Sequence, residues 1–417
     1  MAGMETVEVY LDADQMAGPN LMGTLHCQRS GKGELFSFKY DKTWIARAEA
    51  FAFDPDLALA EGHQYPSADR SNFGIFTDSS PDRWGRLLMQ RRENVRARHE
   101  GRRPRTLTEW DFLLGVHDET RLGALRFKFP NGPYVDSDTK LAAPPLTSLR
   151  ELQAASLQFE QHITEEEHPE YERWLTQLIA PGTSLGGARP KASVRDESGA
   201  LCMAKFPSHQ DTRDVGAWEL VANALARKAG INVPDARPLH FDESAFTTFL
   251  VRRFDRTAEG RRLAFVSAMT LTQHKDGDVG ASYLELVELL QSRGADTVAD
   301  CEQLFRRVLL NILIHNTDDH LRNHGFFIDG RGIRLSPAYD INPSVDRNEL
   351  SLAIDETDST CDVSVAMYAY KSYGISATQA DNALKSVEAT VAGWSAEANR
   401  FRIARAEQAL MAAAFEG

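Results

Sequence analysis

The side chains best suited to chemistry gather in residues 315–342, HNTDDHLRNHGFFIDGRGIRLSPAYDIN. Asp318 and Asn323 have the D-x-x-x-x-N spacing in which, during phosphoryl transfer, an aspartate accepts the proton of the substrate hydroxyl and an asparagine binds magnesium. Asp340 follows later in the same stretch. Because Mg²⁺ is usually held by one or two carboxylates together with substrate phosphates, we predict Asp318 as the catalytic base and Asn323 and Asp340 as metal ligands.

A predicted β-hairpin would bring the metal ligands together. HGFFI and IRLSP flank the sequence DGRG, which is suited to a tight turn. If Phe326 to Ile328 pairs antiparallel with Ile333 to Leu335, the chain returns to its starting point and Asp340 emerges beside Asn323. In the alternative interpretation the polar residues only cap a helix end and a turn, namely Asp318, Asp319 and Asn323.

The histidines of this stretch allow a transition-metal interpretation as well. His315, His320 and His324 have the spacing H-x4-H-x3-H, and imidazole is a common metal ligand. We expect the chain to leave helical geometry after Asn316, so that the three rings diverge. His320 is then expected to orient the catalytic loop by hydrogen bonding.

A lysine and a glutamate upstream form a second candidate pair. Lys205 lies in ALCMAKFP, a predicted strand, and Glu219 follows fourteen residues later on the next predicted helix. A strand lysine that reaches nucleotide phosphates needs a helix carboxylate to hold its ammonium in place, as in kinases. A strand lysine and a helix glutamate are commonplace by themselves, so this assignment depends on the cluster around Asp318.

The segment GTSLGGARPKAS, residues 182–193, is a candidate phosphate-binding loop. Its glycines free backbone N–H groups to approach phosphate oxygens, and its basic side chains add positive charge. No GK[ST] closes it, so it is not a Walker A motif, and it could be only a flexible loop. Ser184 is a candidate for self-phosphorylation. The expected phosphate contacts are Gly186, Gly187, Arg189 and Lys191.

The predicted elements around these candidates are mixed in the first half of the chain. VEVYL (residues 7–11), ELFSFKY (34–40) and GALRFKF (123–129) alternate as strands do. Ser79 to Pro81 start a helix, and Thr106 with Glu109 has the spacing of a capping box for another. One long helix is predicted over residues 149–179, whose acidic run EEEH we interpret as a solvated face.

The second half is predicted to be mainly helical after a short β, β, α pattern. KASVRD and ALCMAKFP are read as strands, DVGAWELVANALARKAGINVP as a helix, and AFTTFLVRRFDR as a further strand. Helices are predicted over residues 301–316 and 394–415. A mixed first half that leads into a helical second half indicates a two-lobed α+β protein.

The length and a proline-bearing polar stretch predict several structural units. A chain of 417 residues exceeds what one hydrophobic core usually supports. The segment from Asp136 to Pro145 suits a connection between units. We predict an N-terminal β-rich subdomain over residues 1–135, a unit with the phosphate loop and the nucleotide lysine over residues 136–256, and a helical unit with the catalytic and metal motifs over residues 257–417.

The composition excludes some classes of protein. A formal net charge of −13 argues against a whole surface built to bind nucleic acid. The local exception is RRENVRARHEGRRPR, residues 91–105, which could contact an acidic partner or nucleic acid, or could be a solvated helix end. No apolar run approaches the ~20 residues of a membrane span, and no secretory signal is evident, so we expect a cytoplasmic protein. Four scattered cysteines are expected to be core thiols.

In this order the motifs resemble those of the HipA family of bacterial serine/threonine kinases, the toxins of toxin–antitoxin pairs. The likeness covers most of the chain, from FTDSSPDRWGR and DFLLGVHDETRLGALRF through SLGGARPK, MAKFP and VRRFDR to TDDHLRN and AYDI. The resemblance implies the two-lobed kinase-like fold, with Asp318 as base and Asn323 and Asp340 on magnesium. It also implies nucleotide contacts from SLGGARPK, including Ala188, and from Lys205, Phe254 and Asp255.

The same resemblance implies an activity and partners. Members are ATP- and Mg²⁺-dependent protein kinases that inhibit growth, and their protein substrates include an aminoacyl-tRNA synthetase. They bind a small HipB-like helix-turn-helix antitoxin, through which alone DNA would be contacted. Phosphorylation of the residue matching Ser184 switches the kinase off. Departures at Arg189, Pro190 and Arg252 affect the loop and hinge, and two alternatives stay open: a nucleotide-holding co-repressor and a small-molecule kinase.

Overall fold

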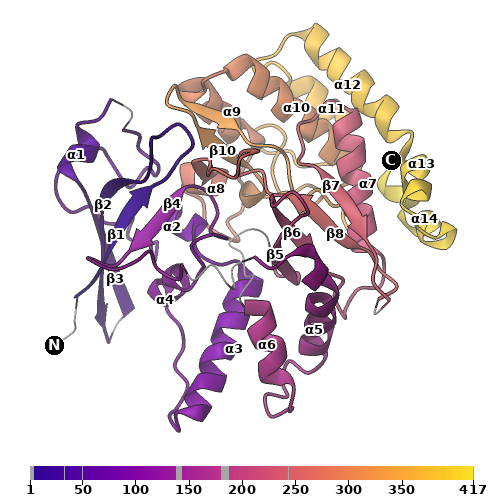
Figure 1. Ribbon diagram of the computed structural model, residues 1–417. Helices are drawn as coiled ribbons and strands as arrows, with labels where there is room; N and C mark the ends of the chain where they lie inside the picture. The colour runs from indigo at the N-terminus through magenta and orange to yellow at the C-terminus, as the bar shows by residue number, and fades with distance from the viewer. Residues whose placement is uncertain are drawn as a thin grey trace. The chain divides into compact units, whose positions relative to one another are not determined.

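The computed structural model of the chain describes residues 4–31, 33–48, 50–137, 143–179, 187–242 and 244–416 (Figure 1). The chain forms two compact units: Met1–His209 with Asp255–Val266, and Gln210–Phe254 with Ser267–Gly417. Each unit combines helices with strands, as the α+β prediction requires. The division into three parts at residues 135 and 256 stays a prediction.

A four-stranded antiparallel sheet opens the first unit. Its order is β3-β2-β1-β4, and the strands are β1 (Met4–Leu11), β2 (Asn20–Ser30), β3 (Gly33–Tyr40) and β4 (Leu125–Lys128). The alternating sequence of β1 buries Val7, Val9 and Leu11 on one face, which confirms the period of two. Two short helices accompany the sheet, α1 (Lys42–Ile45) and α2 (Gly74–Asp78).

The remaining helices of the first unit are α3 (Arg83–His99), α4 (Glu109–Leu114), α5 (Leu149–Gln161) and α6 (Tyr171–Ile179). Asp82 caps α3, because its Oδ1 accepts the N–H of Gly85 at 2.8 Å. The capping box of α4 is made by Thr108 and Asp111, two residues later than the predicted pair of Thr106 and Glu109. A short 3₁₀ turn, η1 (Leu146–Ser148), leads into α5.

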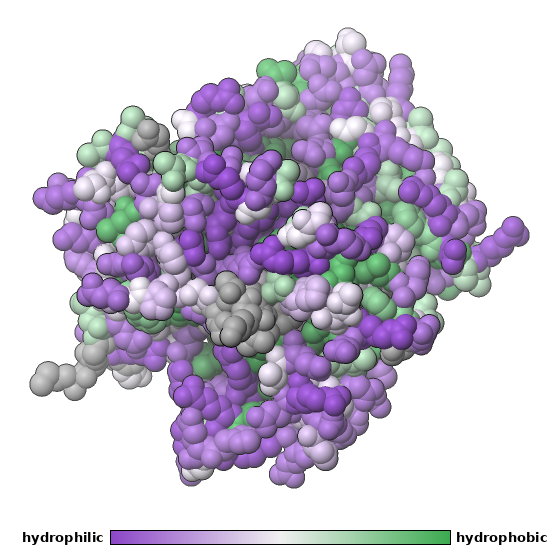
Figure 2. All heavy atoms as spheres, viewed as in Figure 1, coloured by the Kyte–Doolittle hydropathy of each residue, from purple (hydrophilic) through white to green (hydrophobic). Residues whose placement is uncertain are grey.

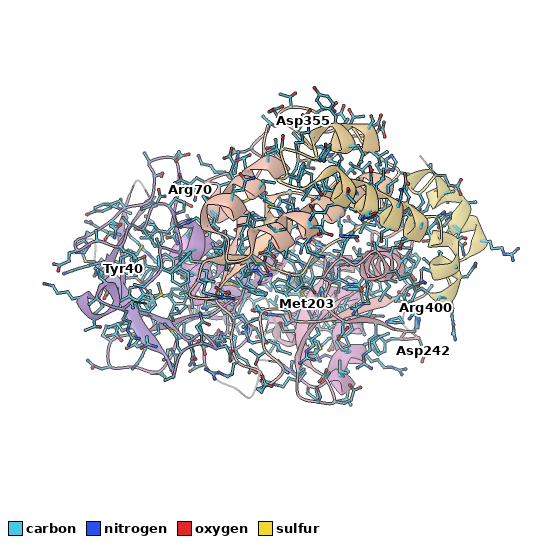
Figure 3. The ribbon with its side chains drawn as sticks, turned by 90° about the horizontal axis from the view of Figure 1, so that it is seen from above. Tyr40, Arg70, Met203, Asp242, Asp355 and Arg400 are labelled. Carbon is cyan, nitrogen blue, oxygen red and sulfur yellow. The ribbon has the colours of Figure 1, made fainter. Side chains whose placement is uncertain are left out.

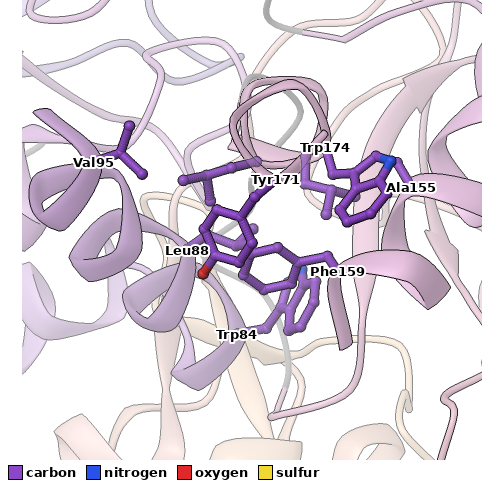
Figure 4. Close-up of a cluster of buried hydrophobic side chains, with 9 residues drawn as sticks. Trp84, Leu88, Val95, Ala155, Phe159, Tyr171 and Trp174 are labelled. Atoms are coloured by element: carbon purple, nitrogen blue, oxygen red, sulfur yellow. The ribbon is translucent and has the colours of Figure 1, made fainter. Parts of the chain in front are cut away.

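The single helix predicted over residues 149–179 is wrong, because the chain forms α5 and α6 with turns between them. Pro169 lies in the break and bars a continuous helix through it, since a proline inside a helix removes a backbone donor and its ring clashes with the preceding turn. The two helices lie beside α3 and share an aromatic core (Figure 4). That cluster comprises Trp84, Leu88, Val95, Ala155, Phe159, Tyr171, Trp174, Leu175 and Leu178.

The predicted β, β, α pattern is present. β5 (Lys191–Arg195) and β6 (Leu201–Lys205) form an antiparallel hairpin in which Lys191 lies opposite Lys205. Met203 of β6 lies among packed side chains in Figure 3. In the second unit, α7 (Val215–Lys228) begins at Asp214, whose side chain accepts the N–H of Ala217, and β7 (Ala236–Leu239) pairs with β8 (Thr248–Arg252).

Helices dominate the rest of the second unit. α10 (Thr297–Leu313) is its buried centre and packs against α9 (Tyr283–Arg293), α11 (Val363–Ala369) and α12 (Ala377–Val391). The helix predicted over residues 394–415 is wrong as one element, because Arg402 takes a left-handed φ of 61°. The chain therefore forms α13 (Trp394–Arg400), α14 (Arg405–Met411) and the 3₁₀ turn η3 (Ala412–Ala414). Before these helices in the chain come β9 (Phe265–Ser267), most of which belongs to the first unit, and α8 (Ala268–Leu271) of the second.

Hydrophilic residues cover most of the face seen in Figure 2, and apolar ones are scattered over it. Arg400, on α13, is among the exposed side chains labelled in Figure 3. Within the described part of the chain, no helix has the length and hydropathy needed to cross a bilayer.

Arg121 ties the C-terminal ends of α2 and α4 together and yields a stability prediction. Its guanidinium is almost fully buried and donates to the carbonyls of Ser79, Leu113 and Val116 at 2.7–2.9 Å. Arg121→Met leaves these oxygens without their donor, so we expect the first unit to lose about 3 kcal/mol of stability. The measurement is the urea midpoint followed by tryptophan fluorescence.

Arg103→Met is the matched control, because Arg103 is exposed in the same unit. It should leave the midpoint unchanged. Equal midpoints for Arg121→Met and the wild type would contradict a structural role for the buried guanidinium.

Candidate active site

The proposed catalytic stretch, residues 315–342, begins just after α10 ends. His315 takes a left-handed φ of 49° and turns the chain out of the helix. The 3₁₀ turn η2 (Leu321–Asn323) then leads into β10 (Gly325–Ile328), which pairs antiparallel with β11 (Ile333–Leu335). The register joins Phe326 to Leu335 and Ile328 to Ile333, which confirms the predicted hairpin residue by residue.

The chain returns after β11 to the place where the hairpin began. The hydroxyl of Tyr339 donates to the carbonyl of Arg322 at 2.7 Å. The residues just before Asp340 and Asn323 are thus in contact, and the predicted convergence of the two metal ligands rests on this bond. Asp340 itself has a left-handed φ of 59°, a conformation that aspartate and asparagine adopt more readily than most other residues.

Burial separates the two adjacent aspartates. The side chain of Asp318 is exposed, whereas Asp319 is buried. Asn323 contacts the same turn, since its Nδ2 donates to the backbone carbonyl of Asp318 at 3.3 Å. An exposed carboxylate on an anchored loop is free to meet a substrate hydroxyl, which suits the role predicted for Asp318.

Asp319 is held by donors from three parts of the second unit. Its Oδ2 accepts the hydroxyl of Tyr283 at 2.6 Å and Nδ2 of Asn311 at 2.8 Å, and Nε2 of His324 lies 2.7 Å away. Burial acts to raise the pKa of Asp319, but His324 and the hydrogen bonds from His324 and Tyr283 keep that pKa below its ordinary value. Burial and the Asp319 charge raise the pKa of Tyr283.

Side-chain amides connect this buried carboxylate to the Asp340 segment. Asn316 donates to Oδ1 of Asn311 at 3.0 Å and accepts the backbone N–H of Asn342 at 3.1 Å. Asn342 in turn donates to Oδ1 of Asp340 at 3.3 Å. These partners were not identified from the sequence. Only the repeated asparagines of the motif could have pointed to them.

The donor set near Asp340 fits an oxygen-preferring cation. Asp340 offers a carboxylate and Asn323 an amide oxygen, and the buried Oδ1 of Asn342 has no hydrogen-bond partner in the described part of the chain. No three His, Cys, Asp or Glu side chains gather as a metal site among the described residues. A divalent ion here would therefore depend on substrate phosphates and water for the rest of its shell, as Mg²⁺ does.

The histidines do not support the transition-metal interpretation. The two ring nitrogens of His315 lie 3.1 Å from the Ala414 carbonyl and 3.1 Å from Oδ1 of Asn348, and His324 contacts Asp319. Nδ1 of His320 is buried without a hydrogen-bond partner among the described residues, so the hydrogen bond expected of this ring is missing at that nitrogen. The backbone carbonyl of His320 does accept the N–H of Asn323 at 2.7 Å.

Lys191 closes the end of the predicted phosphate loop. Its buried ammonium donates to Oδ2 of Asp82 at 2.6 Å and to the carbonyl of Gly187 at 2.7 Å. No sequence pattern pointed to Asp82, which lies 109 positions away. Lys191 therefore anchors the base of the loop in this structure. Gly187, Ala188 and Arg189 are described, while Ser184 and Gly186 lie outside the described residues.

The other predicted nucleotide contacts fall in both units. Lys205 ends β6 in the first unit and Glu219 lies on α7 in the second, both buried, and their pairing stays a prediction. Phe254 stacks on Tyr339 within the second unit, with ring centroids 4.8 Å apart. Asp255 is fully buried in the first unit.

The Asp255 carboxylate has internal partners. Its Oδ2 accepts the N–H of Gly123 at 2.8 Å and an N–H of Arg256 at 2.6 Å. A nucleotide contact from Asp255 stays a prediction.

The arginine-rich segment is largely neutralised inside the first unit. Glu166 accepts from Arg91 at 2.7 Å and from Arg98 at 2.9 Å, so the interpretation of EEEH as only a solvated face is wrong for this residue. Further ion pairs join Arg96 to Glu100, Arg102 to Glu93 and Arg105 to Asp111. The helical interpretation is confirmed for residues 91–99, which belong to α3.

Comparisons with known proteins place the chain in a family. A family model described as the HipA-like C-terminal domain matches residues 183–394. A protein named as a kinase, Y4dM of Sinorhizobium fredii, is 28% identical over 155 residues. That match covers 34% of this chain and 37% of Y4dM, so the chain spans little more than a third of that relative.

Solved structures resemble the chain as well. The HipA chain from the Shewanella oneidensis toxin–antitoxin complex of HipA, HipB and operator DNA matches with a TM-score of 0.68 at 18% identity, over 98% of this chain and 95% of that one. This likeness shows the fold, which is the predicted two-lobed, kinase-like α+β fold. The Helicobacter pylori kinase CtkA matches over 52% of this chain with a TM-score of 0.35 and 14% identity, which is too weak to carry an argument.

The buried carboxylate of Asp319 predicts a pH-dependent contribution to stability. Because its pKa is lower in the folded chain than in the unfolded chain, its ionised form stabilises the fold above about pH 4, and this stabilisation is lost as the pH falls through the depressed folded value. Asp319→Asn should destabilise the second unit by roughly 2 kcal/mol at pH 7. The difference from wild type should shrink on acidification below about pH 4.

Urea midpoints at neutral and acidic pH measure this effect. Asp318→Asn is the matched control, since its exposed side chain should give the wild-type midpoint at both pH values. A destabilisation by Asp319→Asn that stays constant with pH would show that the charge is not what stabilises the loop.

Proposed function

The chain belongs to the HipA-like family, and we propose that it is an ATP- and Mg²⁺-dependent serine/threonine protein kinase with its active centre between Asp318 and Asp340. The observation that supports this most is the hydrogen bond from Tyr339 to Arg322, which draws the Asp340 segment back to the loop that carries the exposed Asp318. If Asp318, Asp319 and Asn323 only capped a helix end and a turn, nothing would require the Asp340 segment to return to this loop.

The proposed chemistry is one of positioning and charge stabilisation. Asp318 would orient the substrate hydroxyl and accept its proton, while the network around Asp319 keeps the loop rigid. Asn323 and Asp340 would hold magnesium, which when bound neutralises charge on the transferred phosphoryl group. Lys205 would contact the α and β phosphates, with Glu219 holding its ammonium.

Regulation and partners are further parts of the proposal. We propose self-phosphorylation at Ser184 as an off-switch, because a dianionic group cannot share a cavity with a triphosphate unless cations neutralise it. A HipB-like helix-turn-helix antitoxin is the proposed partner, on the strength of the likeness to the HipA of a HipA–HipB–DNA complex. The proposed substrate is a cellular protein, for which an aminoacyl-tRNA synthetase is a candidate, and its phosphorylation would inhibit growth.

Asp318→Ala tests the catalytic assignment. We expect transfer of labelled phosphate from ATP to the chain itself to fall at least about a hundredfold, because the base that contributes this factor is gone. Phosphopeptide mass spectrometry locates the label in the wild type, with Ser184 expected. Binding of an antitoxin should persist in the variant, which separates kinase from co-repressor function.

Asp381→Ala is the control for this experiment, because Asp381 is exposed on α12, away from the catalytic stretch in sequence. It should leave transfer unchanged. Persistent self-phosphorylation in Asp318→Ala, with the fold intact by circular dichroism, would refute the assignment of the base.

Magnesium titration tests the other half of the site. Asp340→Ala removes a proposed ligand, and Asn342→Ala removes the amide that holds it at 3.3 Å. Because such outer partners usually contribute 10- to 100-fold, Asn342→Ala should raise the Mg²⁺ concentration for half-maximal transfer roughly tenfold, and Asp340→Ala by more. Asn348→Ala, which contacts His315 instead, should have no effect. An unchanged Mg²⁺ requirement in Asp340→Ala would contradict the metal assignment.

A further inference from the structure

A cavity of about 410 Å³ lies within the first unit, outside the candidate active site. It is open to solvent on one side and is lined by α3, by α6 and by the segments around Val116 and Asp136. Its volume falls in the range of small-molecule sites, and it combines an apolar wall with a few charged groups, as such sites do. None of the nucleotide or catalytic residues named above lines it.

The apolar wall continues the hydrophobic cluster of α3, α5 and α6. Leu88, Val95 and Leu175 belong to that cluster, and Ile179 packs against it. In Figure 4 Val95 lies apart from the aromatic members, on α3. This wall offers a ligand contact with branched apolar side chains, which favours an apolar group on the ligand.

Two charged side chains lining the cavity are not paired with each other or with another described residue. Arg92 makes no hydrogen bond and no ion pair within 4.0 Å in the described part of the chain. Among the described residues, the only hydrogen bond of Asp136 is made by its backbone carbonyl, which accepts the N–H of Asp118 at 2.9 Å. Its carboxylate has no partner there. Both side chains are exposed to solvent, but the packed surroundings of Arg92 still lower its pKa by partial desolvation, and the nearby Asp136 opposes that effect.

The other charges at the cavity already have partners. Arg96 contacts Glu100 at 2.7 Å, and His99 lies 3.0 Å from Glu172. One cation and one anion therefore remain for a ligand. A simple organic anion would leave Asp136 unmatched, and a polyphosphate would meet a carboxylate that repels it.

We propose that this cavity binds a small zwitterion with an apolar side chain, of the class of the free apolar α-amino acids. The ligand carboxylate would lie on Arg92 and its ammonium group on Asp136. Its side chain would contact Leu88, Val95, Leu175 and Ile179. Such a site selects for both charges of the ligand, because removing either charge from the ligand leaves Arg92 or Asp136 without its partner.

Isothermal titration calorimetry on the full chain tests the proposal without reference to phosphate transfer. The probes are L-leucine, L-methionine and L-phenylalanine, with three analogues of leucine. N-acetyl-L-leucine lacks the ammonium group, L-leucinamide lacks the carboxylate, and glycine lacks the side chain. At least one of the three apolar amino acids should bind. N-acetyl-L-leucine, L-leucinamide and glycine should each bind roughly tenfold more weakly than that amino acid, or not at all.

Variants locate the site. Arg92→Gln and Asp136→Asn should each weaken binding of the best amino acid roughly tenfold, whereas Arg92→Lys should retain most of it. Arg103→Gln, in the same arginine-rich segment but outside the cavity, should bind as the wild type does. Circular dichroism and thermal midpoints confirm that each variant is folded.

Three results would overturn the proposal. The first is no binding of any of the three amino acids at millimolar concentrations. The second is equal binding of leucine and both charge-deleted analogues, which would make the site merely apolar. The third is unchanged binding in folded Arg92→Gln and Asp136→Asn variants, which would place the ligand elsewhere.

Discussion

The buried carboxylate of Asp319 is the constraint on which the catalytic stretch depends. A carboxylate deep in a protein is costly unless donors surround it, and here α9, α10 and the residue before β10 each supply one. Three separate parts of the chain must therefore meet at one oxygen atom. The loop that carries Asp318 and Asp319 therefore has little conformational freedom, and the exposed Asp318 is held in a fixed position.

The same hydrogen-bond network determines where the chain goes after the β10–β11 hairpin. β10 and β11 would form from their own alternation and turn, but a hairpin alone does not decide where its second strand ends. The amides of Asn316 and Asn342 and the hydroxyl of Tyr339 fix the returning chain to the loop. Local sequence preference thus forms the hairpin, and long-range hydrogen bonds determine where the chain after β11 lies.

This division explains what could be predicted from the sequence. The hairpin register, the early strands and the β, β, α pattern follow from periodicity and turn residues, which act over a few positions. The spacing to Asn323 singled out Asp318 as the candidate base, but the buried structural role of Asp319 could not be predicted, because only the fold shows which donors surround its carboxylate. The Lys191–Asp82 pair was equally hidden, since its members lie on different elements. Pro169, in contrast, was visible and should have ended the predicted long helix.

Charge in the first unit illustrates how composition can mislead. Seven arginines within residues 91–105 resemble a surface for an acidic partner, yet five of them have carboxylate partners within the unit. These ion pairs cancel much of the positive field that the sequence suggests. The basic segment therefore gives less support to a nucleic-acid or co-repressor function than its sequence did.

The left-handed backbone of Asp340 restricts which residues fit at that position without strain. Glycine adopts this conformation freely, and asparagine and aspartate at modest cost, whereas longer or branched residues are penalised. Of the three, aspartate alone carries a negative charge. Glutamate keeps the charge but loses the backbone preference. In the proposed metal site, aspartate is therefore the residue that combines the required charge with a tolerance for the left-handed backbone of position 340.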